Sequence, residues 1–373
     1  MEDLVRLKTM TFADIYRSKK VFITGHTGFK GSWLTQWLLD LGAAVTGYAL
    51  PPTTQPSIFE QIELKNKIKH IESDIRDFES LKLAIEYAKP DFIFHLAAQP
   101  LVRLSYEKPV ETYSTNVMGT VNILEAVRVI ARPCVVVVIT TDKCYENSER
   151  SEGYSEDDPM GGHDPYSSSK GATELVVSAY RRSYFSNPVL GIRLASVRAG
   201  NVIGGGDWAL DRIVPDCIRA LTNNKPIAVR NKLSTRPWQH VLEPLSGYLW
   251  LAACLYRPDI SRSKQNLDSA FNFGPTADSN RNVQSLVEEI LKSWEGSWID
   301  KSDPSALHEA KLLHLVIDKA ANVLGWKPVW NFEETIYQTI SWYKNEKDLG
   351  VFTQQQIANY TIQARARDIV WAR

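Results

Sequence analysis

Short apolar runs rich in β-branched residues alternate along this chain with segments of helical periodicity. Six such runs predict strands, at Lys20–Thr24, Val45–Ala49, Lys69–Glu72, Phe92–Leu96, Val135–Thr140 and Leu190–Val197. Between the first two, Leu34, Trp37, Leu38 and Leu41 recur at the spacing of one helix face, and residues 115–129 predict another helix. Strands that are apolar on both faces and separated by helices indicate a parallel sheet covered on both sides. The expected fold class is α/β, with a doubly wound parallel sheet.

The pattern changes after Ala199. Glycines cluster at Gly204–Gly206, and helices then mix with short strands near residues 227–230 and 270–273. We therefore predict a first domain over residues 18–198, to which some later segments return. A smaller mixed α/β lobe that binds substrate follows over residues 199–345, and residues 346–373 form a C-terminal extension.

Composition excludes several classes of protein. Basic and acidic residues number 43 each, so no global field attracts nucleic acid or an anionic membrane. The longest apolar run, Val135–Ile139, is far shorter than the ~20 residues of a membrane span, and the N-terminus lacks the apolar core of a signal peptide. Four widely spaced cysteines, without C-x-x-C spacing, favour reduced thiols over a disulfide or a metal site. A cytoplasmic protein without a bound metal is expected.

A glycine-rich turn, Gly25-His26-Thr27-Gly28-Phe29-Lys30-Gly31, connects the first strand to the following helix. Glycine lets the backbone turn tightly and approach a pyrophosphate, whose charge then lies on free amides at the helix N-terminus. A purely structural turn is the alternative. The strand before the turn and the helix after it favour dinucleotide binding.

The G-x-x-G-x-x-G spacing of this turn resembles that of the extended short-chain dehydrogenase/reductase family. The resemblance implies a Rossmann-type fold and a nicotinamide cofactor, with Asp74 and Ile75 near the adenine and residues 96–99 near the nicotinamide ribose. The implied cofactor residues are Gly25, Thr27, Gly28, Phe29, Lys30, Gly31, Asp74, Ile75, Leu96, Ala97, Ala98, Gln99, Thr115, Tyr166 and Lys170.

The end of the second strand bears on the choice between NAD and NADP. An NAD site usually has an acidic residue there for the ribose hydroxyls, whereas this strand ends Tyr48-Ala49-Leu50-Pro51. No arginine follows to hold a 2′-phosphate either. NAD is the expected cofactor.

Tyr166 and Lys170 have the spacing Y-x-x-x-K. Residues four apart share one helix face, so the phenol and the ammonium can point into one pocket. A tyrosine with a pKa near 10 is a poor base at neutral pH, but a neighbouring ammonium stabilises the phenolate and lowers that pKa. An isolated pair of this kind is usually a solvated helix face, so further partners are needed.

Thr141 supplies such a partner, because it lies at the end of the fifth predicted strand. Doubly wound folds place their sites at the carboxyl ends of parallel strands. Thr141 can donate a hydrogen bond to the reacting oxygen of a substrate; the alternative is a hydroxyl that bonds only to backbone.

Asp142 and Lys143 follow Thr141, and here the chain resembles the nucleotide-sugar 4,6-dehydratases. Most of them have Asp-Glu at this point, whereas Asp-Lys is similar to the branch that acts on CDP-glucose. The turn at residues 25–31 agrees with that branch, as do residues 98–103, 198–208 and 234–241, and the similarity runs from about residue 20 to residue 343.

The resemblance implies a lyase that converts CDP-glucose to CDP-4-dehydro-6-deoxyglucose and water, for deoxysugar and O-antigen biosynthesis. Tyr166 takes the proton of the 4-hydroxyl while hydride passes from carbon 4 to NAD. Water is lost across carbons 5 and 6, hydride then returns to carbon 6, and a proton returns to carbon 5. Asp142 protonates the departing 6-hydroxyl, which a dry pocket favours. Lys143 is either an uncharged base for carbon 5 or an ammonium that stabilises the enolate. A purely structural role for both residues is the alternative.

The candidate substrate residues are Arg103, Asn201, Arg198, Arg236 and His240. Arginines suit a diphosphate, although each of them also fits a surface ion pair, and the apolar surroundings of His240 favour a structural role. The family implies a homodimer through the helix that starts near Val110 and the helix that carries Tyr166. Two other functions stay open: another nucleotide-sugar 4,6-dehydratase or 4-epimerase, and a non-catalytic NAD-binding protein.

Overall fold

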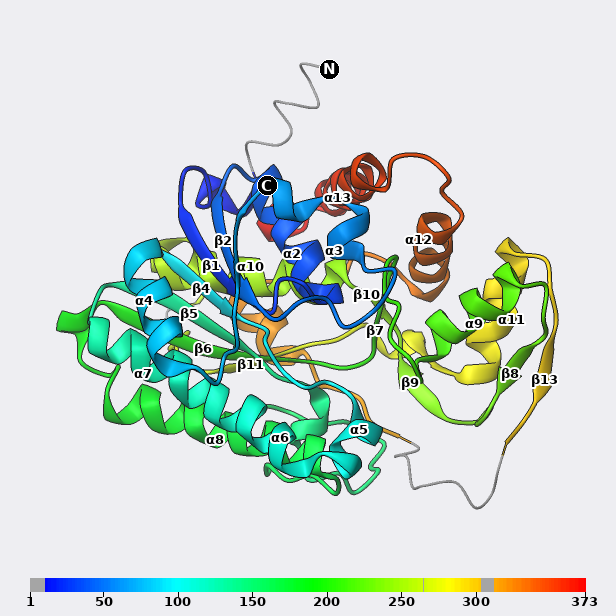
Figure 1. Ribbon diagram of the computed structural model, residues 1–373, viewed down its shortest axis with the longest axis horizontal. Coiled ribbons are helices and arrows are strands. Elements are labelled where there is room, and N and C mark those ends of the chain that lie inside the picture. Colours follow the sequence, from blue (N-terminus) through cyan, green and yellow to red (C-terminus); the bar gives the residue numbers. More distant parts are fainter. Residues whose placement is uncertain (1–10, 264, 303–311) are drawn as a thin grey trace.

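A computed structural model describes residues 11–263, 265–302 and 312–373. A sheet of seven parallel strands lies at its centre, in the order β11-β6-β5-β4-β1-β2-β3 (Figure 1). These strands are β1 Lys20–Thr24, β2 Ala44–Ala49, β3 Lys69–Glu72, β4 Phe92–His95, β5 Cys134–Ile139, β6 Ile192–Ala199 and β11 Ala270–Phe273. The α/β prediction is confirmed. Among the six predicted strands the bounds of β6 differ most from the prediction, because it runs from Ile192 to Ala199 rather than from Leu190 to Val197.

Helices cover both faces of the sheet. On β5, Val135, Val137 and Ile139 pack into the core beneath α2 and α10, whereas Val136 and Val138 pack into the core beneath α4, α7 and α8. Strands that are buried on both faces have no polar alternation, which explains the continuous apolar run of β5. The helices of these layers are α2 Phe29–Asp40, α3 Ile58–Gln61, α4 Phe78–Ala88, α5 Val102–Glu107, α6 Pro109–Tyr113, α7 Gly119–Ile130, α8 Pro165–Ser183 and α10 Leu242–Tyr256.

The predicted helix at residues 115–129 is the second part of a longer helical stretch. It begins with α6, passes through one π-helical turn at Ser114–Met118 and continues as α7. Such π turns are frequent at functional sites.

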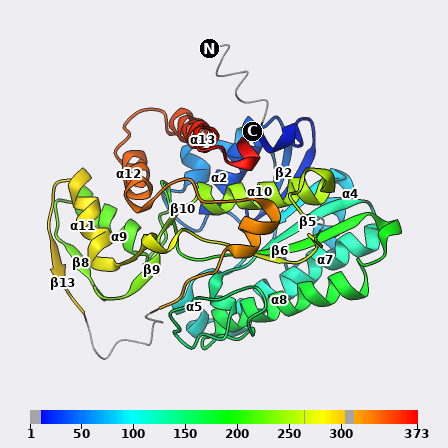
Figure 2. The ribbon, with the colours of Figure 1, turned by 180° about the vertical axis from the view of Figure 1, so that it is seen from behind.

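A smaller lobe has its own apolar core, beside the carboxyl ends of the strands (Figure 2). It contains three two-stranded sheets, which pair β7 with β10, β9 with β12 and β8 with β13. Its elements are β7 Val202–Ile203, α9 Ile213–Thr222, β8 Ile227–Val229, β9 Thr235–Pro237, β10 Gln239–His240, β12 Asn280–Asn282, α11 Val283–Ser293, β13 Trp298–Asp300 and α12 Phe332–Tyr343.

The chain crosses between the sheet and the lobe more than once. Both α10 and β11 lie within residues 199–345, yet β11 pairs with β6 and α10 packs under the sheet. In the C-terminal extension, α13 (Leu349–Ala366) packs against α2. The boundaries at residues 198 and 345 stay predictions.

The four cysteines are buried and free, as their spacing predicted. In the described part of the chain no helix is long and apolar enough to cross a membrane. Among the same residues no group of three or more His, Cys, Asp or Glu is arranged to hold a metal ion.

Candidate active site

The glycine-rich turn lies at the carboxyl end of β1 and has almost no spare room at two of its glycines. Gly25 has a φ of +75°, and a Cβ there would lie 2.6 Å from the amide nitrogen of Ala97. A Cβ on Gly31 would lie 2.2 Å from the carbonyl oxygen of Gly25. These glycines allow the turn, the end of β4 and the start of α2 to approach closely.

Gly28 differs, because it is exposed and faces open space. A Cβ on Gly28 would meet only the Gly25 carbonyl oxygen, at 3.5 Å. Gly28 is also the N-cap of α2, and no side chain caps the amides of that helix end. An open, uncapped helix N-terminus fits a pyrophosphate, so the turn fits a dinucleotide.

The residues predicted near the adenine lie after β3. Asp74 accepts hydrogen bonds from the backbone and side chain of Arg76, which lower the pKa of Asp74 and form an ion pair at 2.6 Å. Ile75 is buried against Gly119, where an added Cβ would lie 2.8 Å from Ile75 Cγ2. The hydroxyl of Thr27 donates to the carbonyl oxygen of Leu50, just after the end of β2, where no acidic residue follows.

The segment predicted to line the nicotinamide ribose, residues 96–99, is held by Asn116. The Gln99 amide donates to Asn116 Oδ1 at 2.8 Å, and Asn116 Nδ2 donates to the Gln99 carbonyl oxygen and to Ser169 Oγ. Asn116 therefore joins the loop after β4 to α8. Thr115 precedes it in the π-helical turn. Sequence reasoning missed Asn116, because it lies among other polar residues of the same helical stretch and no motif marks it.

Tyr166 lies in the first turn of α8, where the sequence sets the helix start. Asp164 caps the helix by accepting from the Ser167 amide at 2.9 Å, and Pro165 occupies the first position. The Tyr166 amide donates to Ser105 Oγ on α5. These contacts aim the phenol at the end of β5.

Thr141, Tyr166 and Lys170 come together in a buried site. The Thr141 hydroxyl is hydrogen-bonded to the Tyr166 hydroxyl, and burial raises the pKa of Tyr166 to about 12. Lys170 Nζ donates to the Ile139 carbonyl oxygen at 3.4 Å, and burial lowers the pKa of Lys170 to about 8. The three side chains are less than a tenth exposed.

Asp142 joins this site from the turn after β5. It accepts a hydrogen bond from Thr141 Oγ1 at 2.9 Å, is 2% exposed, and burial raises its pKa despite nearby Lys143 and Arg236. A Cβ on Gly200 would lie 2.9 Å from Asp142 Oδ2, so this glycine leaves room for the carboxyl group. A buried carboxyl with a raised pKa can be protonated and can donate a proton.

Several cations surround these groups. Lys30 faces Asp142 and Lys170, and burial and then the charge of Arg212 lower the pKa of Lys30 to about 8. Arg212 also faces Tyr166, and it pairs with Asp207 at 2.9 Å. Sequence reasoning missed Arg212 because it lies in a loop before α9 without a motif. Arg236 lies on β9, where Nη1 donates to the Thr235 carbonyl oxygen.

The other predicted substrate residues are dispersed. Arg103 on α5 is exposed and pairs with Asp211 at 3.2 Å, and half-buried Asn201 accepts from the Gln239 amide. His240 is 0% exposed between Trp33 and Trp330, and burial lowers its pKa to about 3. Arg198 is also buried, with its Nη atoms bonded to Glu174, Tyr145 and Glu156. The structure therefore places His240 and Arg198 in the interior, and a contact of either residue with substrate stays a prediction.

Comparison with known proteins gives a consistent result. Residues 22–339 match the GDP-mannose 4,6 dehydratase family. The chain is 49% identical to the CDP-glucose 4,6-dehydratase of Salmonella typhimurium, over 93% of this chain and 97% of the relative. It is 26% identical to the bovine (Bos taurus) dTDP-D-glucose 4,6-dehydratase, over 88% and 89%.

Solved structures share the fold. The UDP-glucose 4-epimerase of Thermus thermophilus, in complex with NAD, superposes with a TM-score of 0.73 at 23% identity, over 88% of this chain and 99% of that one. The dTDP-glucose 4,6-dehydratase of Bacillus anthracis, in complex with NAD, gives 0.71 at 21% identity, over 88% and 97%.

Proposed function

The chain belongs to the GDP-mannose 4,6 dehydratase family, and from that membership and its site we propose that it is an NAD-dependent CDP-glucose 4,6-dehydratase. It converts CDP-glucose to CDP-4-dehydro-6-deoxyglucose and water. The observation that carries this proposal is the buried Asp142 hydrogen-bonded to Thr141 beside Tyr166. A 4-epimerase needs only Thr141, Tyr166 and Lys170, whereas loss of the 6-hydroxyl needs an additional acid.

Two backbone segments form the proposed cofactor site, the turn before α2 and the loop after β4. The open N-terminus of α2 at Gly28 receives the pyrophosphate, and residues 96–99, held by Asn116, line the nicotinamide ribose. NAD bound at these residues would supply the acceptor for the hydride that leaves carbon 4 of the sugar and the donor for the hydride that reaches carbon 6.

Tyr166 and Lys170 act on the 4-hydroxyl. Tyr166 takes its proton while Thr141 orients the same oxygen through a hydrogen bond. Burial raises the pKa of Tyr166 to about 12, so its phenol is scarcely ionised at neutral pH before substrate and cofactor bind. In the proposed mechanism the positive charge of Lys170, on the same face of α8, stabilises the Tyr166 phenolate.

Asp142 and Lys143 act on carbons 5 and 6. A protonated Asp142 donates its proton to the departing 6-hydroxyl, which its raised pKa supports. Lys143, half-buried beside it, removes the carbon 5 proton as an uncharged amine or stabilises the enolate as an ammonium.

Arginines near the site suit the diphosphate of the substrate. Arg236 faces Asp142 and Arg212 faces Tyr166, so both guanidinium groups lie beside the reacting residues. Planar guanidinium groups bind phosphate oxygens in pairs. Arg103 and Asn201 stay predicted substrate residues, nearer the edge of the site.

We further propose a cytoplasmic homodimer that forms through α6, α7 and α8, which lie side by side in Figure 1. Exposed apolar side chains occur on α6, on the π-helical turn after it and on α8, with Val110 at 81%, Met118 at 51% and Leu175 at 63% exposure. Free buried thiols support a reducing compartment. The role in deoxysugar and O-antigen biosynthesis rests on the resemblance to CDP-glucose dehydratases.

The test is incubation of the purified protein with CDP-glucose and catalytic NAD, followed by mass spectrometry of the sugar nucleotide. UDP-glucose and dTDP-glucose serve as controls. We expect loss of one water from CDP-glucose only. Unchanged mass with inverted stereochemistry at carbon 4 would instead identify an epimerase, and no turnover of any sugar nucleotide would leave a binding role.

A further inference from the structure

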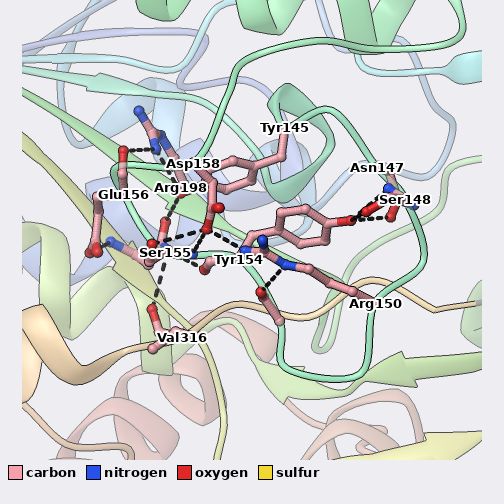
Figure 3. Close-up of polar contacts among 12 residues, drawn as sticks. Tyr145, Asn147, Ser148, Arg150, Tyr154, Ser155, Glu156, Asp158, Arg198 and Val316 are labelled. Carbon is pink, nitrogen blue, oxygen red and sulfur yellow. Dashed lines mark hydrogen bonds and ion pairs between the residues drawn. The ribbon is translucent and has the colours of Figure 1, made fainter.

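Arg198 belongs to a buried polar network beneath the reacting residues. It is the second-last residue of β6, is 4% exposed, and its Nη2 donates to Glu174 Oε2 at 2.9 Å. Its Nη1 donates to the Tyr145 hydroxyl at 2.6 Å and to the Glu156 carbonyl oxygen at 3.2 Å (Figure 3). These three hydrogen bonds therefore hold the Arg198 guanidinium in one position.

Glu174 is the carboxylate at the centre of this network. It accepts from Thr140 Oγ1 at 2.5 Å on one oxygen, and from Ser196 Oγ at 2.7 Å and Arg198 on the other. Burial alone would raise the pKa of Glu174, but the charge of Arg198 and these hydrogen bonds hold it below its usual range. Glu174 is therefore a buried anion that is fixed by β5 and β6.

Glu174 also shares one face of α8 with the reacting residues. Tyr166, Lys170 and Glu174 follow one another at intervals of four residues. They contact the end of β5 at Thr141, at the Ile139 carbonyl oxygen and at Thr140, in that order along the helix. Three successive turns of α8 therefore contact three consecutive residues, 139–141, where β5 ends.

Ionisable groups from four parts of the fold face Lys170. They are Glu174 on α8, Cys144 after β5, Lys30 on α2 and His95 on β4. Burial raises the pKa of Cys144 well above its usual range and lowers that of His95 to about 3, so both are uncharged at neutral pH. Glu174 is then the anion that opposes the loss of the Lys170 proton.

We propose that the Glu174–Arg198 pair positions the catalytic helix and keeps Lys170 charged. Glu174 locks α8 to β5 and supplies the negative charge, while Arg198 fixes the Glu174 carboxylate. The pair touches neither substrate nor cofactor, so both are positioning residues. This inference rests on the proposed function, in which Lys170 must be cationic to stabilise the Tyr166 phenolate.

The variant Glu174→Gln tests the charge, because glutamine keeps the shape and an acceptor oxygen. We expect the alkaline limb of the kcat–pH profile to move to lower pH by about one unit or more, with KM little changed. Nuclear magnetic resonance of isotopically labelled lysine, assigned with Lys170→Arg, should show Lys170 titrating at lower pH by the same amount. This titration needs no substrate, so it tests the inference even where CDP-glucose is not the substrate.

The matched control is Asp268→Asn. Asp268 pairs with Arg193 at 2.6 Å and accepts from the Leu194 amide, near the opposite end of β6. We expect this variant to leave the pH profile and the Lys170 titration unchanged. A shift of equal size in Asp268→Asn, or an unshifted Lys170 in Glu174→Gln, would overturn the proposal.

A second variant keeps the proposal testable if Glu174→Gln does not fold. Glu174→Gln leaves Arg198 as an unpaired buried charge, which destabilises the folded protein. Glu174→Gln combined with Arg198→Met removes both charges, a change that buried pairs often tolerate. We expect a smaller downward shift of the Lys170 titration, because Glu174 is the nearer charge. A folded double variant with wild-type titration would equally refute the proposal.

Discussion

Asp142 shows how one residue changes the chemistry of a site that many enzymes share. Thr141, Tyr166 and Lys170 suffice to move a proton at an alcohol, but they offer no acid for a departing hydroxyl. Asp142 is buried next to them, and burial favours its protonated form. At this scale our proposal assigns to one carboxyl group the acid that a dehydratase needs and an epimerase does not.

The variant Asp142→Asn is therefore expected to lower kcat for dehydration by roughly a hundredfold or more, the usual contribution of a general acid. The melting temperature should not fall, because asparagine fills the same space without a carboxyl group to desolvate. Product mass and the unfolding curve measure the two effects. The control is Asp300→Asn, at an exposed carboxylate that pairs with Lys232. Dehydration by Asp142→Asn as fast as by this control would show that Asp142 is not the acid for the departing hydroxyl.

At the scale of elements, two glycines in the turn between β1 and α2 are needed for different reasons. Gly31 is required by the fold, because a Cβ there meets the Gly25 carbonyl oxygen at 2.2 Å. Gly28 is not required by the fold, since its Cβ would have ordinary contacts. It lies instead where a pyrophosphate approaches the open end of α2.

Gly28→Ala and Gly31→Ala should consequently fail in different ways. We expect Gly28→Ala to weaken NAD binding at least tenfold while the free energy of unfolding changes by less than about 0.5 kcal/mol. Gly31→Ala should lower that free energy by about 1–3 kcal/mol, as overpacking does. Titration calorimetry and denaturant unfolding measure the two quantities. Wild-type NAD affinity in Gly28→Ala would show that the pyrophosphate does not approach that residue.

At the scale of the molecule, the C-terminal extension is part of the core. Glu243 on α10 accepts from the Val329 and Trp330 amides and from the Tyr360 hydroxyl on α13, at 2.7 Å to 2.9 Å. Near the other end of the chain, Phe12 stacks on Trp371 with ring centroids 5.0 Å apart. The C-terminal residues therefore pack against both α10 and the N-terminal segment, which are far from them in the sequence.

Tyr360→Phe should lower the free energy of unfolding by about 1–3 kcal/mol, because it removes a donor to a buried carboxyl group. Tyr337→Phe, on an exposed tyrosine of α12, is the control and should change it by less than about 0.5 kcal/mol. Denaturant unfolding compares the two. Equal stabilities would mean that the Tyr360 hydrogen bond does not secure the extension.

The proposed dimer gives a prediction of its own. Leu175→Asp replaces an exposed apolar side chain of α8 by a charge and should convert dimer to monomer in light scattering. Val189→Asp, at 87% exposure in a turn after α8, should leave the dimer intact. A dimer that survives Leu175→Asp would place the contact elsewhere.

The sequence by itself determined six of the seven strands of the sheet, the glycine-rich turn and the grouping of Thr141, Tyr166 and Lys170, whereas β11 was assigned to the smaller lobe. Strands buried on both faces, such as β5, carry an apolar run that needs no knowledge of distant residues. The glycine spacing and Y-x-x-x-K are local patterns as well. Thr141 followed because parallel strands present their carboxyl ends at one edge.

Only the tertiary structure decided what lies between distant segments. Arg212, Asn116 and Glu174 have no motif, and each acquires its role from a side chain remote in sequence. Arg198 and His240 were both candidate substrate residues in the sequence, although the apolar surroundings of His240 already favoured a structural role. Their fate depended on burial, and burial is set by which elements pack against a residue, a property of the whole fold rather than of the residue's neighbours along the chain.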